Sequence, residues 1–430
     1  MSRDLFDTGP DDGLDLHPDD TFFEPTPAAA QARLTAVRPS AYARTRNHLA
    51  GAVTRLSPYL THGLLTPPQV ADDLQARFAL PANHKLRMEL GWRAFFHHRW
   101  QHLGAAIFES LHAGPRPDSD YAATLPADVR EARSGVPAID QAVRQLHATG
   151  WLHNHARLWL ASYVVHVRGV HWRAGADWLY GHLLDGDLAS NHLSWQWVAG
   201  TGSHQPYLAN AENIARHTAG VPALAAWRSE GSVIDTAYEL LGDWAHGRAP
   251  WPAPSAPAMA GVAEPALRHT LPAEAALSSD ADAQAVLQAA RAALRPLWLM
   301  HPWALAAPPP RADGRAWCVL GLWPGAFLRR WPWSARRIGF VGQRFAAVAE
   351  AVVAVDDAHT LAQALADWPA EIAGWDDPHL AECAATPGTP WPLPEALGWR
   401  RTPPAWLPEP AKPQRSFSAY WAAVQKLHRR

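Results

Sequence analysis

Several features that define other classes of protein are scarce or missing in this chain of 430 residues. Its two cysteines, Cys318 and Cys383, are too few for a four-thiolate iron–sulfur cluster or for a disulfide framework. No apolar run approaches the roughly 18 residues that a membrane-spanning helix needs. The acidic start of the chain lacks the apolar core of a signal peptide. These absences predict a cytoplasmic protein with no metal cluster, no other metal site and no membrane partner.

Two further absences concern nucleotides and nucleic acids. The net charge is −2 and the pI is near 6.9, so no overall positive field attracts nucleic acid, and any DNA contact needs a local patch. Neither a GxGxxG motif nor a Walker A motif follows any predicted strand. The sequence therefore gives no support to a dinucleotide site or a P-loop of those kinds.

What the chain has in excess is tryptophan, with 23 residues. Indoles are large enough to dominate both cores and ligand pockets, and most of these are expected to pack in cores. The 48% hydrophobic and 18% charged content is that of an ordinary folded protein with room for two or three domains.

Composition and periodicity divide the chain into four parts. These are a loose leader, a helical domain, a Pro/Ala-rich linker and a C-terminal domain, at residues 1–25, 26–247, 248–285 and 286–430. Within the helical part, Ile139, Val143 and Leu146 recur at helical spacing, and the segment WLHNHARLWLASYVVHV is expected to continue a long apolar-faced helix.

The C-terminal part changes character. Short apolar runs (LRPLWLMHPW, RAWCVLGLW, AVVAVDD) alternate with segments of helical spacing (RRIGFVGQRFAAVAEA, HTLAQALADW). Alternation of this kind predicts a small parallel, Rossmann-like α/β domain over roughly 290–385. A Pro- and Trp-rich tail follows and ends in an amphipathic helix at SFSAYWAAVQKLHRR. The basic end of that helix suits a solvated helix terminus or, alternatively, a nucleic-acid contact.

The richest local motif is LLDGDLASNHLSWQW, which combines the acids Asp185 and Asp187, the amide of Asn191 and two indoles. Such a set suits a polar, conjugated ligand and electron transfer. TRLSPYLTHGLLTPPQV, MELGWRAFFHHRW and GWLHNHAR precede it. In their order along the chain, between Tyr42 and about His217, the four motifs resemble the FAD-binding helical domain of the DNA photolyase and cryptochrome family. The predicted fold class is thus a multi-domain α and α/β protein, with an all-helical photolyase-like domain first.

The resemblance implies FAD as the cofactor and assigns a set of flavin contacts. It pairs Arg157 with Asp185, lets Asp187 accept a hydrogen bond from the pyrimidine-ring edge, and places Asn191 opposite N5, where an amide is compatible with a fully reduced anionic flavin. The implied cofactor-binding residues are Tyr42, Thr54, Leu56, Ser57, Arg93, Asn154, Arg157, Asp185, Asp187 and Asn191. For Ser57, an ordinary helix N-cap is the alternative.

Glu89, Trp92 and Arg93 share one helix face by their spacing. The resemblance implies that Glu89 contacts the damaged pyrimidine pair and that Trp92 stacks on it, which makes Glu89, Trp92 and Asn191 the catalytic set. A surface Glu–Arg pair next to a core tryptophan is the alternative. The residues implied on the DNA side are Arg46, Glu89, Trp92, His155, Leu158 and Trp197.

The resemblance also implies a chain of aromatic residues that photoreduces the flavin. Trp195 and Trp172 match its inner two members. Ser119 and Val129 stand where the third tryptophan is expected, so nearby Tyr121 is predicted as the terminal donor. Alternatively, the route ends at Trp172 or leaves through another of the many indoles.

Three substitutions depart from the family pattern. His155 replaces an arginine that contacts a DNA phosphate, Leu158 replaces a methionine against the substrate, and Val53 replaces one of two hydroxyl residues. A neutral histidine is a weaker phosphate partner than arginine. We therefore expect weak or single-strand-preferring binding of UV-damaged DNA.

The architecture departs as well, because an antenna domain precedes the helical domain in the family and only about 40 residues do so here. The C-terminal α/β domain is predicted as a relocated antenna-like domain, with the identity of any second antenna chromophore open. Alternatively, it is a module that binds a protein partner.

Together these observations predict an FAD-dependent blue-light flavoprotein. It resembles deoxyribodipyrimidine photolyase, a lyase that repairs UV-induced pyrimidine dimers in DNA by light-driven electron transfer. A cryptochrome-like photoreceptor or redox flavoprotein that does not repair DNA is the main alternative. A flavin-stabilised scaffold that binds another protein through its C-terminal domain is the third.

Overall fold

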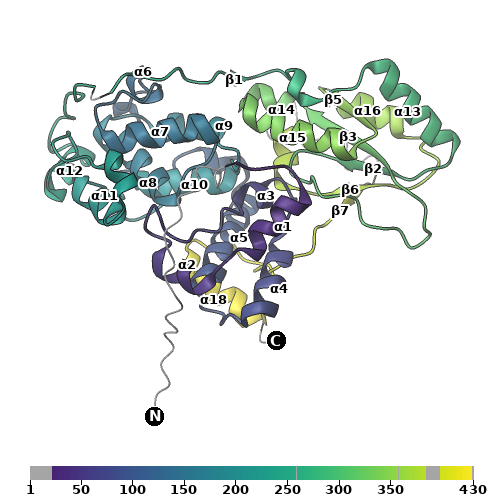
Figure 1. Ribbon diagram of the computed structural model, residues 1–430, viewed down its shortest axis with the longest axis horizontal. Coiled ribbons are helices and arrows are strands. Elements are labelled where there is room, and N and C mark those ends of the chain that lie inside the picture. The colour runs from purple at the N-terminus through teal and green to yellow at the C-terminus, as the bar shows by residue number, and fades with distance from the viewer. Residues whose placement is uncertain (1–21, 258, 357, 384–397, 429–430) are drawn as a thin grey trace, which may run out of the picture.

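The computed structural model describes residues 22–257, 259–356, 358–383 and 398–428, and it has a helical part and an α/β part (Figure 1). The α-helices of the helical part are α1 (Pro27–Thr35), α2 (Pro39–Thr45), α3 (Ser57–Thr61), α4 (Pro67–Phe78), α5 (Lys85–Leu103), α6 (Ala127–Arg130), α7 (Pro137–Thr149), α8 (Asn154–Ser162), α9 (Trp172–His182), α10 (Leu188–Ala199), α11 (Ala211–Thr218) and α12 (Tyr238–Ala245). No helix within the described ranges is long and apolar enough to cross a lipid bilayer.

Local sequence signals set the ends of these helices. Gly150 ends α7 in the left-handed conformation, with φ of 70°. His153 then accepts a hydrogen bond from the backbone of His155, so α8 begins as a separate helix. The expected continuation of the preceding helix into residues 151–167 is therefore wrong, because Gly150 interrupts it. From Asn154 onward the segment is helical, and α8 passes into a single π-helical turn at Tyr163–Val167.

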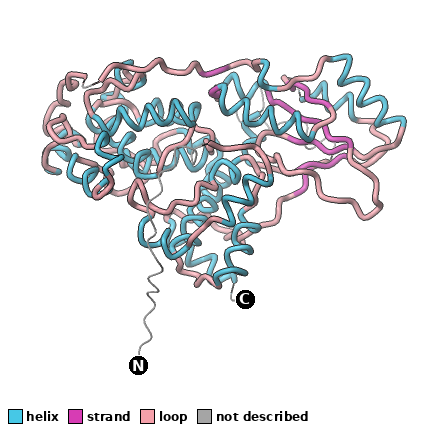
Figure 2. Tube along the Cα trace, in the orientation of Figure 1, coloured by secondary structure: helices cyan, strands magenta, loops and turns pink. Residues whose placement is uncertain are grey.

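The C-terminal part is a five-stranded sheet in which every pairing is parallel. Its strands are β2 (Leu297–Met300), β3 (Cys318–Pro324), β5 (Ala351–Val355), β6 (Ile372–Trp375) and β7 (Arg400–Arg401), in the spatial order β5-β3-β2-β6-β7. Its helices are α13 (Asp280–Ala292), α14 (Gly325–Arg330), α15 (Ala335–Val348) and α16 (Ala358–Leu365). Figure 2 shows the strands gathered in this part of the molecule. The predicted combination of a helical part and a small parallel α/β domain is confirmed.

The segment between α12 and α13 is bound to the helical part along much of its length. Trp251 packs on Gly169, where a Cβ atom would lie 2.7 Å from the indole. The carboxylate of Glu264 accepts hydrogen bonds from Trp178 and His182 and pairs with Arg130. This segment, residues 249–268, is called the strap below. It ends in β1 (Leu267–Arg268), which pairs antiparallel with β4 (Trp333–Ser334) of the α/β domain.

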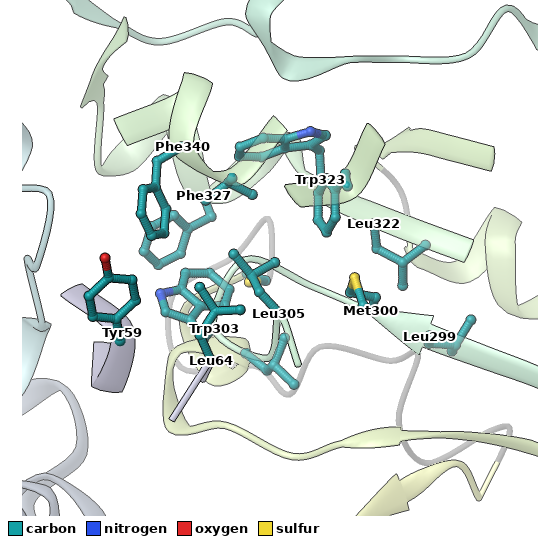
Figure 3. Close-up of a cluster of buried hydrophobic side chains, with 14 of the residues drawn as sticks. Tyr59, Leu64, Leu299, Met300, Trp303, Leu305, Leu322, Trp323, Phe327 and Phe340 are labelled. Atoms are coloured by element: carbon teal, nitrogen blue, oxygen red, sulfur yellow. The ribbon is translucent and has the colours of Figure 1, made fainter. Parts of the chain in front are cut away.

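The two domains share one hydrophobic core. Tyr59 and Leu64 of the helical part belong to the same buried cluster as Trp303, Leu305 and Phe340 of the α/β domain (Figure 3). The rings of Tyr59 and Phe340 lie 6.4 Å apart. Burial of this shared apolar surface holds the domains against each other.

The last described helix, α18 (Phe417–His428), returns to the helical part and packs on α5 (Figure 1). Gly91 of α5 makes this contact close, because a Cβ there would lie 2.4 Å from the ring of Trp421. Phe417 and Tyr420 join Phe95 in the same small apolar cluster. The tail helix is therefore an integral part of the packing around α5.

Candidate functional site

Two carboxylates lie on the short loop between α9 and α10, here called the acid loop (residues 185–187). Asp187 is the N-cap of α10, since its Oδ1 accepts a hydrogen bond of 2.8 Å from the backbone of Ser190. Asp185 and Asp187 are 5% and 3% exposed. Buried carboxylates require charged or hydrogen-bonding partners, so their surroundings decide what this loop can do.

Asp185 is paired with Arg157 of α8. Nη2 of Arg157 lies 3.0 and 2.7 Å from the two carboxylate oxygens, and its Nε donates to the carbonyl of Leu152. Thr61 of α3 donates to the backbone carbonyl of Asp185 at 3.2 Å. The ion pair that the resemblance implied is present, and it ties α8 to the acid loop.

Asp187 faces two cationic or polar side chains of α5. Arg93 Nη2 lies 3.2 Å and His97 Nε2 lies 2.8 Å from its Oδ2. Burial by itself would raise the pKa of the Asp187 carboxyl, but Arg93 and His97 hold that pKa well below its usual range. Asp187 is therefore an ionised acceptor.

A polar stripe on α5 leads from this buried position to the surface. Glu89, Arg93 and His97 follow one another at intervals of four residues and share a face of the helix. The Glu89 side chain is 41% exposed and lies 3.5 Å from Nε of Arg46. Partial burial raises the pKa of Glu89, although Arg46 opposes this effect. Glu89 also adds to the raised pKa of Tyr42, whose main cause is burial.

Asn191 lies one helical turn after Asp187 on α10. Its Nδ2 donates to the carbonyl of Ala176 at 2.8 Å, which fixes the orientation of the amide. Next to it, the hydroxyl of Ser190 is buried and has no hydrogen-bond partner in the part of the chain that the structure describes. A buried polar atom without a partner is unusual and suits contact with a polar ligand.

These groups fit the polar edge of a flavin. That edge carries one N–H donor between two carbonyl acceptors and requires complementary groups side by side. The acid loop offers an ionised acceptor at Asp187, which is paired with the cationic donor Arg93. The Arg157–Asp185 pair and the fixed amide of Asn191 add further polar groups. Asn154 is exposed at the start of α8, on the same helix as Arg157.

The residues expected at the diphosphate lie around the start of α3. Leu56 occupies the N-cap position without a side-chain cap, and Ser57 is the first helical residue, so Ser57 is not the N-cap. Ser57 Oγ accepts a hydrogen bond from Trp151 Nε1, and Thr54 Oγ1 accepts one from the backbone of Leu56, both at 3.4 Å. Both hydroxyl groups are thus hydrogen-bonded within the protein.

The aromatic residues proposed for electron transfer lie in one cluster. Trp195 is buried on α10 against Gly175, where a Cβ would lie 2.3 Å from the indole. Trp172 is buried at the start of α9 and donates to Ser110 Oγ at 3.0 Å. Tyr121 packs against the same cluster. Its ring lies 6.2 Å from that of His171, which lies 5.6 Å from Trp172.

The histidine on the expected DNA side lies among other basic groups. The ring of His155 stacks on that of His217 at 4.7 Å, and burial, with added repulsion from His217 and Arg46, lowers its pKa to about 4. His155 is therefore neutral near pH 7. Leu158 is half-buried, and Trp197 is 41% exposed, with its ring 5.4 Å from that of Tyr207.

Trp92, predicted to stack on the lesion, already stacks on an aromatic ring of the tail. The rings of Trp92 and Phe417 lie 4.1 Å apart at an angle of 11°. One face of this indole is therefore covered by α18 in the structure.

Sequence reasoning missed four contacts of the acid loop. His97 follows Arg93 by one helical turn, so the spacing along α5 could have identified it. Thr61 lies within a motif that was recognised for other residues. Arg337 and His379 come from the α/β domain, and no local pattern marks them.

One group of described residues, His98, His102 and Glu409, has the spacing of metal ligands. Both ring nitrogens of His98 are already used, because Nδ1 contacts Glu409 and Nε2 accepts a hydrogen bond of 2.9 Å from the backbone of Gln414. These contacts anchor the tail to α5 and leave His98 no nitrogen for a metal ion.

Comparisons with known proteins agree with this geometry. Residues 86–219 match the family described as the FAD binding domain of DNA photolyase. A deoxyribodipyrimidine photo-lyase of Streptomyces griseus is 34% identical over 215 residues, which cover 47% of this chain and 46% of the relative. A cryptochrome DASH of Natronomonas pharaonis is 31% identical over 198 residues, with 44% and 42% covered.

Among solved structures, a Synechocystis cryptochrome matches with a TM-score of 0.42 and 27% identity, over 47% of this chain and 45% of that one. The chain spans about half the length of the curated relatives it matches. The matched region contains α5, α8, α9, the acid loop and α10. Through this region, residues 86–219, the chain matches the FAD binding domain of DNA photolyase.

Proposed function

We propose that this protein is a light-driven flavoenzyme that repairs UV-induced pyrimidine dimers in DNA, a lyase of the deoxyribodipyrimidine photolyase type. The observation that carries the proposal is the polar stripe of α5. It connects a half-exposed acid, Glu89, to the buried acid loop through Arg93. A substrate bound over Glu89 would thus lie next to the flavin edge that Asp187 and Asn191 contact.

When bound, reduced FAD would supply light-driven electron transfer to the dimer, and the acid loop with Arg157 and Asn191 would hold it. The protein's own residues hold the charges and protons around this exchange. Arg157 balances Asp185, and Arg93 and His97 keep Asp187 ionised. Partial burial raises the pKa of Glu89, and its carboxyl, when protonated, can donate a hydrogen bond to a pyrimidine carbonyl.

DNA binding is proposed to be weak. Extrusion of a lesion from the duplex costs a few kcal/mol, which stacking and phosphate contacts must supply. The net charge of −2 and the neutral His155 give little electrostatic help, so Arg46 is the principal cation beside Glu89. We therefore propose a preference for single-stranded or otherwise unpaired damaged DNA, and we expect a shallow dependence of affinity on salt.

One observation favours a second function, that of a cryptochrome-like photoreceptor or redox flavoprotein that does not repair DNA. Phe417 covers one face of Trp92, the indole that is expected to stack on a lesion. If the tail stays in place, Trp92 is a packing residue, and the α/β domain is where a protein partner would bind.

Light-dependent recovery of thymine absorbance tests the proposal. The purified protein is photoreduced without oxygen and illuminated with an oligonucleotide that carries one cyclobutane thymine dimer. We expect recovery in the unaltered protein and a loss of about 10-fold or more in Glu89→Ala, which removes the hydrogen-bond donor. Glu212→Ala is the matched control, because Glu212 is also an exposed helical acid paired with an arginine, Arg216, and lies outside the acid-loop contacts.

The outcomes separate the two functions. Recovery that falls about 10-fold or more in Glu89→Ala and is preserved in Glu212→Ala supports repair. A flavin that photoreduces normally while thymine absorbance stays flat in every variant supports the second function instead.

A further inference from the structure

The α/β domain meets the acid loop at the edge of its sheet where open α/β folds bind ligands. Such ligands lie beyond the carboxyl ends of the strands, at the point where the strand order reverses. Here β2 lies between β3 and β6, so this point is flanked by the segments that follow Met300 and Trp375. The acid loop and its neighbours lie against these segments.

Contacts from the α/β domain reach the centre of the acid loop and the residue that follows it. Arg337 Nη2 donates to the carbonyl of Gly186 at 2.5 Å. His379 Nε2 accepts a hydrogen bond of 3.2 Å from the backbone N–H of Leu188. On the other side, the ring of His62 lies between the carbonyls of Leu184, at 2.9 Å, and of Pro302, at 2.6 Å.

Arg337 is placed with particular closeness. It is fully buried, and its guanidinium lies 3.8 Å from the ring centre of Trp333 and 4.9 Å from that of Tyr180. A Cβ atom on Gly186 would lie 2.5 Å from its Nη1, so only a glycine between the two acids admits this approach. A buried cation is costly without compensating charge, and Asp185 and Asp187 supply that charge from either side of Gly186.

We propose that the α/β domain forms part of the flavin site, with Arg337 as a positioning residue that fixes the acid loop and adds a positive charge beside the flavin. His379 supports the same loop at the start of α10. The proposal rests on FAD binding by the helical domain and extends it to residues outside the matched region. The flavin's affinity and reduction potential then depend on a domain that follows the helical part in sequence.

Arg344 provides a matched control on the same helix. It is 8% exposed, and its Nε donates to the carbonyl of Leu305 at 2.9 Å, within its own domain. Arg337→Gln and Arg344→Gln therefore remove the same charge and a hydrogen bond to a backbone carbonyl, and they differ in whether that carbonyl belongs to the acid loop.

The experiment uses the full chain freed of flavin. FAD is titrated into each variant and followed by flavin fluorescence, and the midpoint potential of the bound flavin is measured against redox dyes. We expect Arg337→Gln to weaken FAD binding about tenfold or more, the effect of losing a charge-assisted hydrogen bond. The potential of the flavin bound to this variant should become more negative, because a nearby cation favours the reduced anionic flavin and the variant lacks that cation. Arg344→Gln changes neither, and Arg337→Lys restores the potential.

Equal effects of the two glutamine variants on FAD affinity would overturn the proposal, as would an unchanged potential in Arg337→Gln. Where Arg337→Gln does not fold, His379→Gln is titrated in its place, and FAD affinity equal to that of the unaltered protein counts against the proposal. Failure of the unaltered protein to take up FAD would overturn both this inference and the proposed function. Normal uptake with no difference among the variants would overturn this inference alone.

Discussion

Replacement of Phe417 by alanine tests how firmly the tail covers α5. Phe417 is 7% exposed and contacts the rings of Trp92, Phe95 and Trp421, at centroid distances of 4.1, 6.1 and 5.7 Å. Loss of a buried phenylalanine costs about 3–5 kcal/mol in a large core. This cluster is small and near the surface, so we expect about 2–3 kcal/mol, of which the stack on Trp92 contributes about 1 kcal/mol.

The assay is urea unfolding followed by circular dichroism, together with limited proteolysis of the tail. Leu427→Ala is the control, because Leu427 lies on the same helix, is 37% exposed and should change the free energy of unfolding by less than about 0.5 kcal/mol. If Phe417→Ala behaves like Leu427→Ala in both measurements, the tail is not held by this cluster and the reasoning fails.

The same variant bears on function. If Phe417 keeps a lesion away from Trp92, its removal should raise the rate of thymine-dimer repair in the illuminated assay. A protein that repairs dimers equally well with and without Phe417 would show that the tail does not limit access to this face of α5.

Three further predictions concern other parts of the molecule. Burial would raise the pKa of Glu264, but hydrogen bonds from His182 and Trp178 and the pair with Arg130 lower it to about 2 from an ordinary 4.5. Its contribution to stability is thus present above pH 4.5 and lost as the pH falls towards 2. Over this pH window, the free energy of unfolding measured in urea should fall by about 1–2 kcal/mol more for the unaltered protein than for Glu264→Gln. An equal fall in both proteins would contradict this. His155→Arg should tighten binding to damaged DNA about fivefold and steepen its salt dependence, as measured by fluorescence anisotropy, whereas unchanged affinity would exclude a phosphate near this position. Trp172→Phe should slow photoreduction of the flavin about tenfold or more in absorbance traces, and an unchanged rate would remove Trp172 from the electron route.

Much of the fold could be predicted because its signals are local. Short apolar runs gave β2, β3 and β5, and helical spacing gave α15, α16 and α18. The break between α7 and α8 was missed, although Gly150 and the capping residue His153 both mark it. The binding of the strap could not be predicted, because a Pro/Ala-rich composition is compatible with a free linker and with a docked one.

The site divides in the same way. Asp187, Asn191 and Trp195 follow one another at intervals of four residues. Asp187 is the N-cap of α10, and the helical repeat then puts Asn191 and Trp195 on the same face of the helix. Arg337 lies about 150 positions from the loop it contacts and bonds to a backbone carbonyl, which any residue type carries. The Trp92–Phe417 stack joins positions that are even farther apart in the sequence. Contacts of this kind leave no periodic trace in a single sequence.

The return of α18 to α5 gives the α/β domain two attachments to the helical part, one through the strap and one through the tail. In topological terms, the domain is held like an insertion, although it is encoded after the helical part. A domain anchored at both ends cannot rotate outward about a single hinge without releasing one attachment. Since both domains also share one core, separation of the acid loop from Arg337 and unfolding of the chain are coupled events, and the protein is expected to denature as a single cooperative unit.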